Sequence, residues 1–306
     1  MDLKSYEYVV AIDQEKSFSK AAKKLFISQP SLSQYISRLE DSLKVTLFDR
    51  NTSPVSLTQE GKLYIEAMTE VSNILTNLEK KFEDISELKI GVLNLGLTPS
   101  KSTSILPLVL PKFKKKYPNV ELVLKEAPSA RLEALLVSGD VDMCIMNLPI
   151  KDKNIEYDVL KEENIYVAAP ADFEPSSTKD IGLEYPSIEL SDLNEKPFIL
   201  LHPDQRLRQI SDKLFSGSGV KPRTILETNS IETAQLLTNA GLGFCFVPES
   251  SIKSPALAKI SKSSKTKYYA IGDKGFSWTL VIAYKKGNYR TKAVNAFSET
   301  AKDNIK

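Results

Sequence analysis

The stretch that decides the fold runs from residue 17 to residue 61 and reads SFSKAAKKLFISQPSLSQYISRLEDSLKVTLFDRNTSPVSLTQEG. It contains two short segments in which apolar residues recur at helical spacing, 21–26 and 31–43. Only residues 27–30 separate them, and Pro30 fits the first turn of a new helix because its missing N–H costs nothing there. This spacing predicts a helix-turn-helix.

The second segment has an apolar face and a polar face. Four apolar residues at the 3.6-residue period predict its buried stripe: Leu32, Ile36, Leu39 and Leu43. The opposite face begins with uncharged groups that both donate and accept hydrogen bonds, which suits reading base edges in a major groove. We therefore expect DNA contacts from Ser28, Gln29, Pro30, Ser31, Ser33, Gln34 and Arg38. An ordinary helical hairpin fits the same spacing, but its solvated face would normally carry alternating Lys and Glu.

The segments on either side favour DNA binding. Apolar residues upstream predict a supporting helix over about 2–13, and two extended pieces, 46–50 and 55–57, predict a two-stranded wing. Arg50 of the wing could reach a phosphate or the minor groove, and Lys20, Lys23 and Lys24 could face the DNA backbone. Each of these charges, taken singly, is equally compatible with a solvated surface group.

Many positions of this stretch form a pattern with fixed spacing: Ser17-Phe18, Ala21-Ala22, Leu25, Ser28 to Ser33, Ile36, Leu39-Glu40, Leu43, Leu47-Phe48, Arg50, Val55, Leu57-Thr58 and Gly61. The pattern resembles the N-terminal signature of LysR-type transcriptional regulators, which implies a winged helix-turn-helix DNA-binding domain over 1–58. The chain departs from the family at Lys44, which replaces a usual glycine, and at Glu60, which replaces a small residue. A left-handed turn kept at Lys44 would cost about 1 kcal/mol.

A long helix is predicted after the wing, over 59–87. Thr58 can cap it, and Glu60 lies in its first turn, where negative charge favours the helix dipole. Apolar residues then alternate spacings of four and three: Tyr64, Met68, Val71, Leu75, Leu78, Phe82 and Ile85. This heptad seam predicts pairing with the same helix of a second subunit. The alternative, an amphipathic helix packed on its own domain, normally shows a wider apolar face.

The remaining two-thirds of the chain alternates predicted strands and helices. A first set has strands over 88–95, 120–124 and 141–146, with helices over 103–117 and 129–138. A second set has strands over 165–169, 197–201, 223–227 and 244–247, with helices over 204–215 and 231–240. This alternation predicts an α/β fold with parallel sheets covered on both faces. A last strand over 276–284 and a helix from about Arg290 predict a return to the first set, with crossovers near 162–166 and 268–271.

Short motifs in these segments resemble the effector-binding half of the LysR family: Ile105-Leu106-Pro107, Phe113, Tyr117 to Val120, Gly139 to Asp142, Gly241 to Gly243 and Val247-Pro248. The resemblance implies a periplasmic-binding-protein-like pair of α/β subdomains over 88–306. We expect subdomain I over 88–163 and 269–306, and subdomain II over 164–268. The resemblance is weakest over 171–186, which is predicted to be a surface loop.

Ligands of paired open sheets bind beyond the carboxyl ends of the strands, where helix N-termini point N–H groups into a crevice. Hydroxyl, amide and cationic side chains occur at those positions and favour a small anionic or polar effector: Thr98, Ser100, Lys101, Ser102, Ser129, Asn147, His202, Arg206, Asn229 and Ser230. Helix capping alone explains a Ser or Asn at such a position equally well.

Composition excludes several function classes. The net charge is only +2 over 306 residues, so any DNA contact must come from a local face of the protein rather than a general basic coat. No apolar run approaches the roughly 18 residues that cross a membrane, and the first residues do not form a signal sequence. We therefore expect a cytoplasmic protein without membrane contact, whose length suggests about two domains.

Catalysis has little support in the sequence. His202 is the single histidine, so no catalytic site, metal site or cofactor is predicted. Cys144 and Cys245 lie in apolar strands and are predicted to be buried and inert, with a redox-sensing pair as the alternative. Phe276, Trp278 and Tyr284 follow a strand pattern and are expected in the core.

Two functions from different classes fit these observations. The first is a DNA-binding transcriptional regulator, dimeric or tetrameric, in which an effector closes the crevice and re-angles the paired helices. The second is a solute-binding receptor or transport-associated protein whose N-terminal helices mediate assembly. The wing and the lack of an export signal favour the first.

Overall fold

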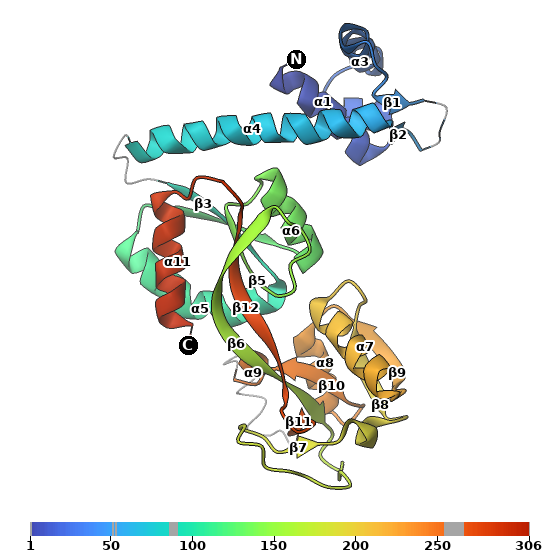
Figure 1. Ribbon diagram of the computed structural model, residues 1–306, viewed down its shortest axis with the longest axis vertical. Helices are drawn as coiled ribbons and strands as arrows, with labels where there is room; N and C mark the ends of the chain where they lie inside the picture. The colour runs from blue at the N-terminus through green and yellow to red at the C-terminus, as the bar shows by residue number, and fades with distance from the viewer. Residues whose placement is uncertain (1, 51, 53, 86–90, 254–265, 306) are drawn as a thin grey trace. The chain divides into compact units, whose positions relative to one another are not determined.

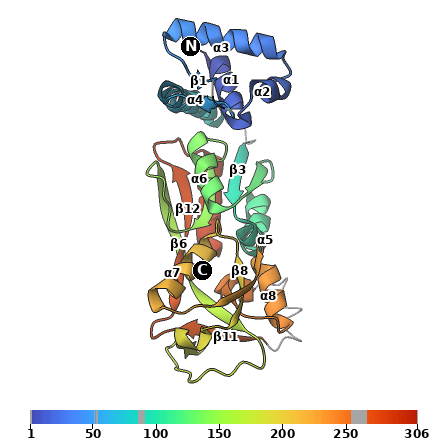
Figure 2. The same cartoon turned by 90° about the vertical axis from the view of Figure 1, so that its right-hand side faces the viewer.

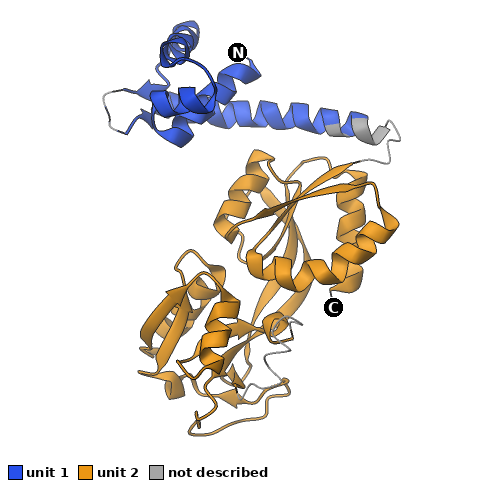
Figure 3. Cartoon of the chain, turned by 180° about the vertical axis from the view of Figure 1, so that it is seen from behind, with its two compact units in different colours: residues 1–83 blue, residues 84–306 orange. Residues whose placement is uncertain are grey.

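Two compact units make up the chain, residues 1–83 and residues 84–306 (Figure 3). The computed structural model describes residues 2–50, 52, 54–85, 91–253 and 266–305. The first unit is helical with a small antiparallel ladder, and the second combines strands and helices. The predicted fold class is confirmed.

Three helices and a wing begin the first unit. The helices are α1 (Leu3–Glu15), α2 (Phe18–Lys24) and α3 (Gln29–Leu43), and the wing pairs β1 (Phe48–Asp49) with β2 (Ser56–Leu57). The predicted helix-turn-helix and wing are therefore confirmed. Both α2 and α3 begin earlier than predicted, because the hydroxyls of Ser17 and Ser28 accept backbone N–H bonds and cap their first turns.

The apolar stripe of α3 packs against α1 and α2. Leu32 and Ile36 are fully buried, Leu39 is nearly so, and Leu43 is partly buried. They pack with residues of α1, α2, the wing and the segment before it: Tyr8, Val9, Ile12, Ala21, Ala22, Leu47 and Phe48. Because the core takes up this stripe, the opposite, polar face of α3 is turned to solvent.

Lys44 ends α3 in the left-handed conformation, with φ at 57°. Its N–H donates to the Asp41 carbonyl at 3.3 Å, and the Val45 N–H donates to the Glu40 carbonyl at 3.2 Å. The left-handed turn that usually carries glycine is thus kept with a lysine in it.

A single long helix, α4 (Gln59–Ile85), follows the wing (Figure 1). The Thr58 hydroxyl accepts the N–H of Gly61 at 2.9 Å, which confirms the predicted cap. Tyr64 and Met68 are buried in the core of the first unit, so these two seam positions pack on their own domain. The next four seam residues are 40% to 61% exposed: Val71, Leu75, Leu78 and Phe82. The part of the seam open to a partner helix therefore begins at Val71.

In one half of the second unit, helices cover both faces of a sheet (Figures 1 and 2). Its strands are β3 (Val92–Leu97), β4 (Glu121–Glu126), β5 (Met143–Asn147) and the antiparallel β12 (Phe276–Lys285). One face packs on α5 (Pro99–Lys116) and α11 (Lys292–Asn304), the other on α6 (Ser129–Ser138). Alternate residues of β5 divide between them, since Met143 and Ile145 face α5 and α11 whereas Cys144 and Met146 face α6.

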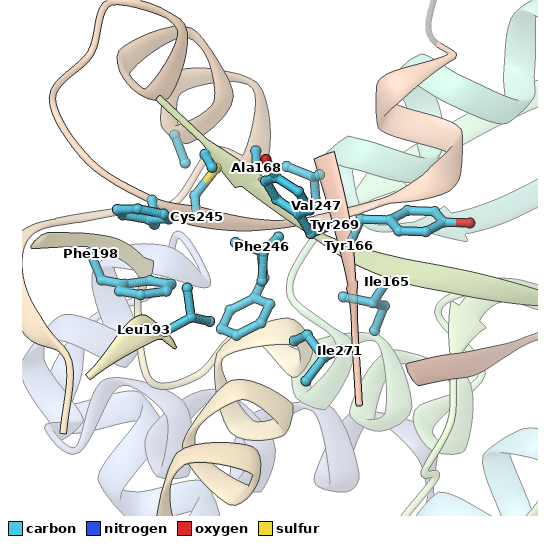
Figure 4. Close-up of a cluster of buried hydrophobic side chains, with 14 of the residues drawn as sticks. Ile165, Tyr166, Ala168, Leu193, Phe198, Cys245, Phe246, Val247, Tyr269 and Ile271 are labelled. Atoms are coloured by element: carbon cyan, nitrogen blue, oxygen red, sulfur yellow. The ribbon is translucent and has the colours of Figure 1, made fainter. Parts of the chain in front are cut away.

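The other half has its own core. Its strands are β8 (Pro197–Leu201), β9 (Arg223–Thr228), β10 (Cys245–Pro248) and β11 (Lys267–Ile271), and its main helices are α7 (Arg206–Ser218) and α8 (Ile231–Asn239). β8 and β9 pair in parallel, as predicted, but β10 and β11 pair antiparallel with β6 (Ile155–Ala169), so the prediction of a parallel sheet is wrong for these two strands. Figure 4 shows Leu193, Phe198 and Phe246 gathered in this core beside Cys245.

The long strand β6 (Ile155–Ala169) joins the two halves. It pairs antiparallel with β12 over residues 155–165 and with β10 and β11 over its last residues. The predicted strand, 165–169, covers only its final third and is wrong in its start. The polar run 161–164 separates the apolar residues of the first part from the apolar run 165–169, which hides the continuity of the strand in the sequence.

Other bounds also differ from the prediction. β11 stays paired with β6 and β7 (Ser187–Ile188), so the chain returns to the first half over 272–275 rather than near 268–271. Two short helices, the 3₁₀ helix η1 (Leu190–Leu193) and α9 (Glu249–Ile252), were not predicted. Residues 88–90 of the first predicted strand lie outside the described residues. The division of the chain at 58, at 87 and between two subdomains stays a prediction.

Replacing Lys44 with glycine should raise the free energy of unfolding by about 1 kcal/mol, because glycine adopts the left-handed turn without strain. A matched control, Lys20→Gly inside α2, should lower it by roughly 0.5–1 kcal/mol. Chemical denaturation of the full chain, followed by circular dichroism, measures both. A destabilised Lys44→Gly protein would show that the lysine side chain itself supports the turn.

Candidate DNA-reading face and effector cavity

The polar face of α3 starts at the helix cap. The Ser28 hydroxyl accepts the N–H of Ser31 at 3.2 Å and lies 2.7 Å from the Ser31 hydroxyl. Pro30 stands in the first turn, as predicted. The predicted contact residues of this face are exposed except Ser33, which is half-buried: Ser28, Gln29, Pro30, Ser31, Gln34 and Arg38. The face thus presents hydroxyl, amide and guanidinium groups to solvent, and its DNA contacts stay a prediction.

Lys20 and Lys24 are exposed on α2. The Lys24 ammonium donates to the side-chain oxygens of Gln14 at 3.0 Å and Glu15 at 3.1 Å. Ion pairs between exposed groups contribute little in water. The contact of Lys24 with a DNA phosphate stays a prediction.

Arg50 is held at the base of the wing. Its Nη2 donates to Glu40 Oε2 at 2.8 Å, and its Cζ lies 5.4 Å from the centroid of the Phe18 ring. The other Glu40 oxygen accepts the N–H groups of Leu47 at 2.7 Å and Phe48 at 3.3 Å. Glu40 thus fixes both the start of the wing and the direction of Arg50, a role that sequence patterns did not indicate.

A cavity of about 360 Å³ lies between α6 and the start of α7. Its size suits a small molecule. The lining residues come from α6, from the loop after β5 and from the start of α7: Ser129, Ala130, Glu133, Ala134, Lys151, Asp152, Asp204, Arg206 and Gln209. Two of them, Ser129 and Arg206, belong to the predicted effector set.

A buried ion pair spans this cavity wall. Arg206 Nη2 donates to Glu133 Oε1 at 3.0 Å, and the two side chains are 7% and 9% exposed. Glu133 Oε2 accepts the backbone N–H groups of Lys151 at 2.9 Å and Asp152 at 3.1 Å. The Arg206 Nε atom is buried and has no hydrogen-bond partner among the residues that the structure describes. Glu133 is therefore well satisfied, whereas Arg206 keeps donor capacity.

Sequence reasoning missed Glu133, Lys151, Asp152, Asp204 and Gln209 as cavity residues. A signal for two of them was present, because Glu133 follows Ser129 by four residues and Gln209 follows Arg206 by three, which places each pair on one helix face. The loop residues carried no such signal.

The other eight predicted effector residues do not line this cavity. Thr98 precedes α5, Ser100, Lys101 and Ser102 lie in its first turns, Asn147 ends β5, His202 follows β8, and Asn229 and Ser230 precede α8. The Ser230 hydroxyl accepts the N–H of Thr233 at 3.1 Å, so capping explains this residue. The Asn147 side-chain nitrogen is buried and lacks a partner within the described part of the chain. A role of these residues in effector binding stays a prediction.

Lys101 is engaged in a network where the two halves of the second unit meet. Its ammonium donates to Glu163 Oε2 at 2.7 Å, and the two side chains are 2% and 0% exposed. Glu163 also accepts the indole N–H of Trp278 at 2.7 Å and the backbone N–H of Ser250 at 2.8 Å. Burial opposes ionisation of Glu163, yet the Lys101 charge and these hydrogen bonds lower its pKa to about 2. The network joins α5, β6, β12 and α9.

Cys144 and Cys245 are buried thiols in different cores. Burial raises the pKa of both, that of Cys245 to about 12. The predicted burial of both is confirmed, and neither thiol ionises near neutral pH, which disfavours reaction with oxidants. Trp278 and Tyr284 are likewise buried as predicted, and Phe276 is partly buried.

Acid should weaken the fold through Glu163. Because its pKa in the folded chain lies below the ordinary value of 4.5, its contribution to stability is complete above pH 4.5 and is lost as the pH falls toward 2. Glu163→Gln should flatten the pH dependence of Tm between about pH 5 and pH 3, and should lower Tm at pH 7 because Lys101 stays buried without its counter-charge. Glu162→Gln, at the exposed neighbouring residue, is the control. Calorimetry over this range measures both, and an unaltered slope in Glu163→Gln contradicts the assignment.

None of the helices within the described ranges is long and apolar enough to cross a bilayer. The same ranges contain no group of three or more His, Cys, Asp or Glu side chains that could hold a metal ion.

Comparisons with known proteins cover both units. Residues 3–62 match the family described as "Bacterial regulatory helix-turn-helix protein, lysR family", and residues 86–306 match "LysR substrate binding domain". The uncharacterized HTH-type transcriptional regulator YcgK of Bacillus subtilis is 31% identical over 320 residues, which cover 100% of this chain and 95% of YcgK. The HTH-type transcriptional regulator BenM of Acinetobacter baylyi is 30% identical over 257 residues, 82% of this chain and 81% of BenM.

Solved structures agree with the sequence matches. The crystal structure of full-length BenM superposes with a TM-score of 0.58 at 26% identity and covers 99% of this chain and 96% of that one. Both family matches and the similarity along the full length show that this chain belongs to the LysR family of DNA-binding transcriptional regulators with an effector-binding domain.

Proposed function

We propose that this regulator reads a two-fold DNA site with the polar face of α3, under the control of a small anionic effector bound in the cavity between α6 and α7. The single observation that carries the effector assignment is Arg206, whose buried Nε has no partner in the described residues and which borders a cavity of about 360 Å³. The capped α3 and its wing support the DNA assignment.

The chemistry of Arg206 favours an oxyanion. A guanidinium presents its donors in a planar fork that matches a carboxylate or phosphate, and a buried one gains most from such a partner. Lys151 adds a second cation to the cavity lining, and the Ser129 hydroxyl adds a further polar group. The lining also holds the carboxylates of Glu133, Asp152 and Asp204, so the proposed anion would be held by direct hydrogen bonds from Arg206 rather than by a net positive charge.

Effector binding would compete with Glu133 for Arg206. The Arg206–Glu133 pair joins α7 of one half to α6 of the other, so an anion that takes over Arg206 loosens or reshapes this link. The angle between the two halves would then respond to occupancy, which is a shift between two populated arrangements. The same shift would re-angle the paired α4 helices of the oligomer.

The exposed part of the α4 seam supports self-association. An apolar line over residues 71–82, which spans nearly two heptads, is open to a second copy at Val71, Leu75, Leu78 and Phe82. A dimer presents two α3 helices with two-fold symmetry, and pairs of dimers would give the tetramer. We infer a cytoplasmic regulator without catalytic activity, because the proposed DNA site lies in the cytoplasm and the proposed function requires only binding.

Arg206→Gln should abolish the stabilisation of the protein by small carboxylates. Acetate, succinate and benzoate at matched ionic strength are the probes, and a bound anion at 100 times its Kd should stabilise the wild type by about 2.7 kcal/mol. Arg208→Gln is the matched control, since Arg208 lies on the same helix but bonds to Asp212 and Glu227. Thermal-shift and calorimetric titrations measure both. Stability that no anion changes, with binding of neutral apolar compounds instead, would overturn the effector class.

Gln34→Ala and Lys20→Ala should weaken DNA binding in different ways. Loss of a base contact at Gln34 should cost about 1–3 kcal/mol on the selected site and relax sequence preference, with little change in salt dependence. Loss of a phosphate contact at Lys20 should weaken all sequences alike and reduce the slope of log Kd against log salt by about 1. Footprinting and titration on a site selected from random DNA measure these effects. Wild-type binding by both variants would remove α2 and α3 from the interface.

A further inference from the structure

Phe26 stands fully in water in the turn between α2 and α3. Its side chain is 95% exposed, the highest value among the large apolar residues that the structure describes as exposed. Its backbone is left-handed, with φ at 56°. A residue with a Cβ adopts this conformation at an energetic cost, and an aromatic ring gains nothing from full exposure. Neither property of Phe26 helps the first unit to fold.

The turn holds the ring in a defined place. The N–H of Phe26 donates to the Lys23 carbonyl at 3.2 Å, and the N–H of Ile27 donates to the Ala22 carbonyl at 3.0 Å. Leu25 and Ile27, on either side, pack partly against the core. Phe26 therefore projects from a fixed backbone, and its exposure follows from the turn geometry.

The surroundings of the ring are those of the proposed DNA interface. Lys23 and Lys24, just before it, are exposed cations, and Ser28 and Gln29, just after it, begin the exposed polar face of α3. The ring is thus the apolar member of a continuous surface whose other members suit phosphates and base edges.

We infer that Phe26 is a DNA contact, whose ring packs on the apolar face of a deoxyribose in the strand that the α2–α3 turn meets. This inference rests on the proposed DNA-reading face. On one side of the ring, lysines would contact the phosphates, and on the other side, polar groups of α3 would contact the bases. The deoxyribose lies between phosphate and base and is the apolar surface that the ring can cover. Burial of the ring against the sugar would offset the free-energy cost of the left-handed backbone and of the exposed apolar surface.

The test is Phe26→Gly in the full chain, because stability and binding should change in opposite directions. Glycine relieves the left-handed strain, so Tm should rise. Affinity for the selected DNA site should fall about tenfold, with an unchanged slope of log Kd against log salt, because no charge is removed. Phe26→Tyr keeps the ring and should bind within about twofold of the wild type, whereas Phe26→Asn, which tolerates this backbone, should bind like the glycine variant.

Four results would overturn the inference. A lower Tm for Phe26→Gly would show that the ring supports the fold, and wild-type affinity would show that it does not meet DNA. A shift in oligomer dissociation measured by ultracentrifugation, with DNA affinity following it, would show that it meets a second copy. Replacing each thymine with uracil should not alter the ratio of wild-type to Phe26→Gly affinity, and a ratio that collapses would assign the contact to a thymine methyl instead of the sugar. Gln34→Ala and Lys20→Ala, run in parallel, separate failure at Phe26 from failure of the whole interface.

Discussion

The second unit depends on one antiparallel ladder, the pairing of β6 with β12. The ladder runs from Ile155 opposite Lys285 to Ile165 opposite Phe276, and beyond it β6 continues into the other half with β10 and β11 as its partners. Glu163 lies directly opposite Trp278 in this register, which explains why the indole N–H reaches the carboxylate. The buried charge of Lys101 is therefore fixed to the one strand that both halves share. Any rotation of one half against the other must therefore bend β6 where its pairing partner changes from β12 to β11.

Helices whose ends are marked by a capping residue, a proline or a glycine could be predicted from the sequence. The helix-turn-helix carries a cap at Ser28, a proline two residues later and an apolar stripe. Pro128 precedes α6, and Gly139 ends it in the left-handed conformation. The start of β6 was missed because residues 161–164 read KEEN and separate the alternating apolar residues of its first part from the apolar run 165–169. Heptad spacing likewise does not distinguish a residue that packs on a partner helix from one that packs on its own domain. Tyr64 and Met68 follow the spacing but are buried in the core of the first unit.

The candidate effector site was predictable only in part. Cations and hydroxyls near strand ends indicated Ser129 and Arg206, but Glu133 binds Arg206 across 73 residues of sequence, and no pattern reports such a pair. Lys101 shows the opposite case, since a lysine in the first turn of a helix looks like a ligand group until its buried carboxylate is known. Chemical type and position along the chain indicate which groups could bind an anion. Whether such a group is still free to bind an anion depends on the hydrogen bonds and ion pairs that it makes within the folded chain.

The first glycine of the chain is Gly61, so the left-handed turns at Lys16, Phe26 and Lys44 form without glycine. A segment of 60 residues without glycine has fewer conformations open to it when unfolded. The first unit therefore gives up less chain entropy on folding than a glycine-bearing equivalent would, and this offsets part of the strain in its turns. Side chains at all three turns become available for use at the surface, where glycine would offer none.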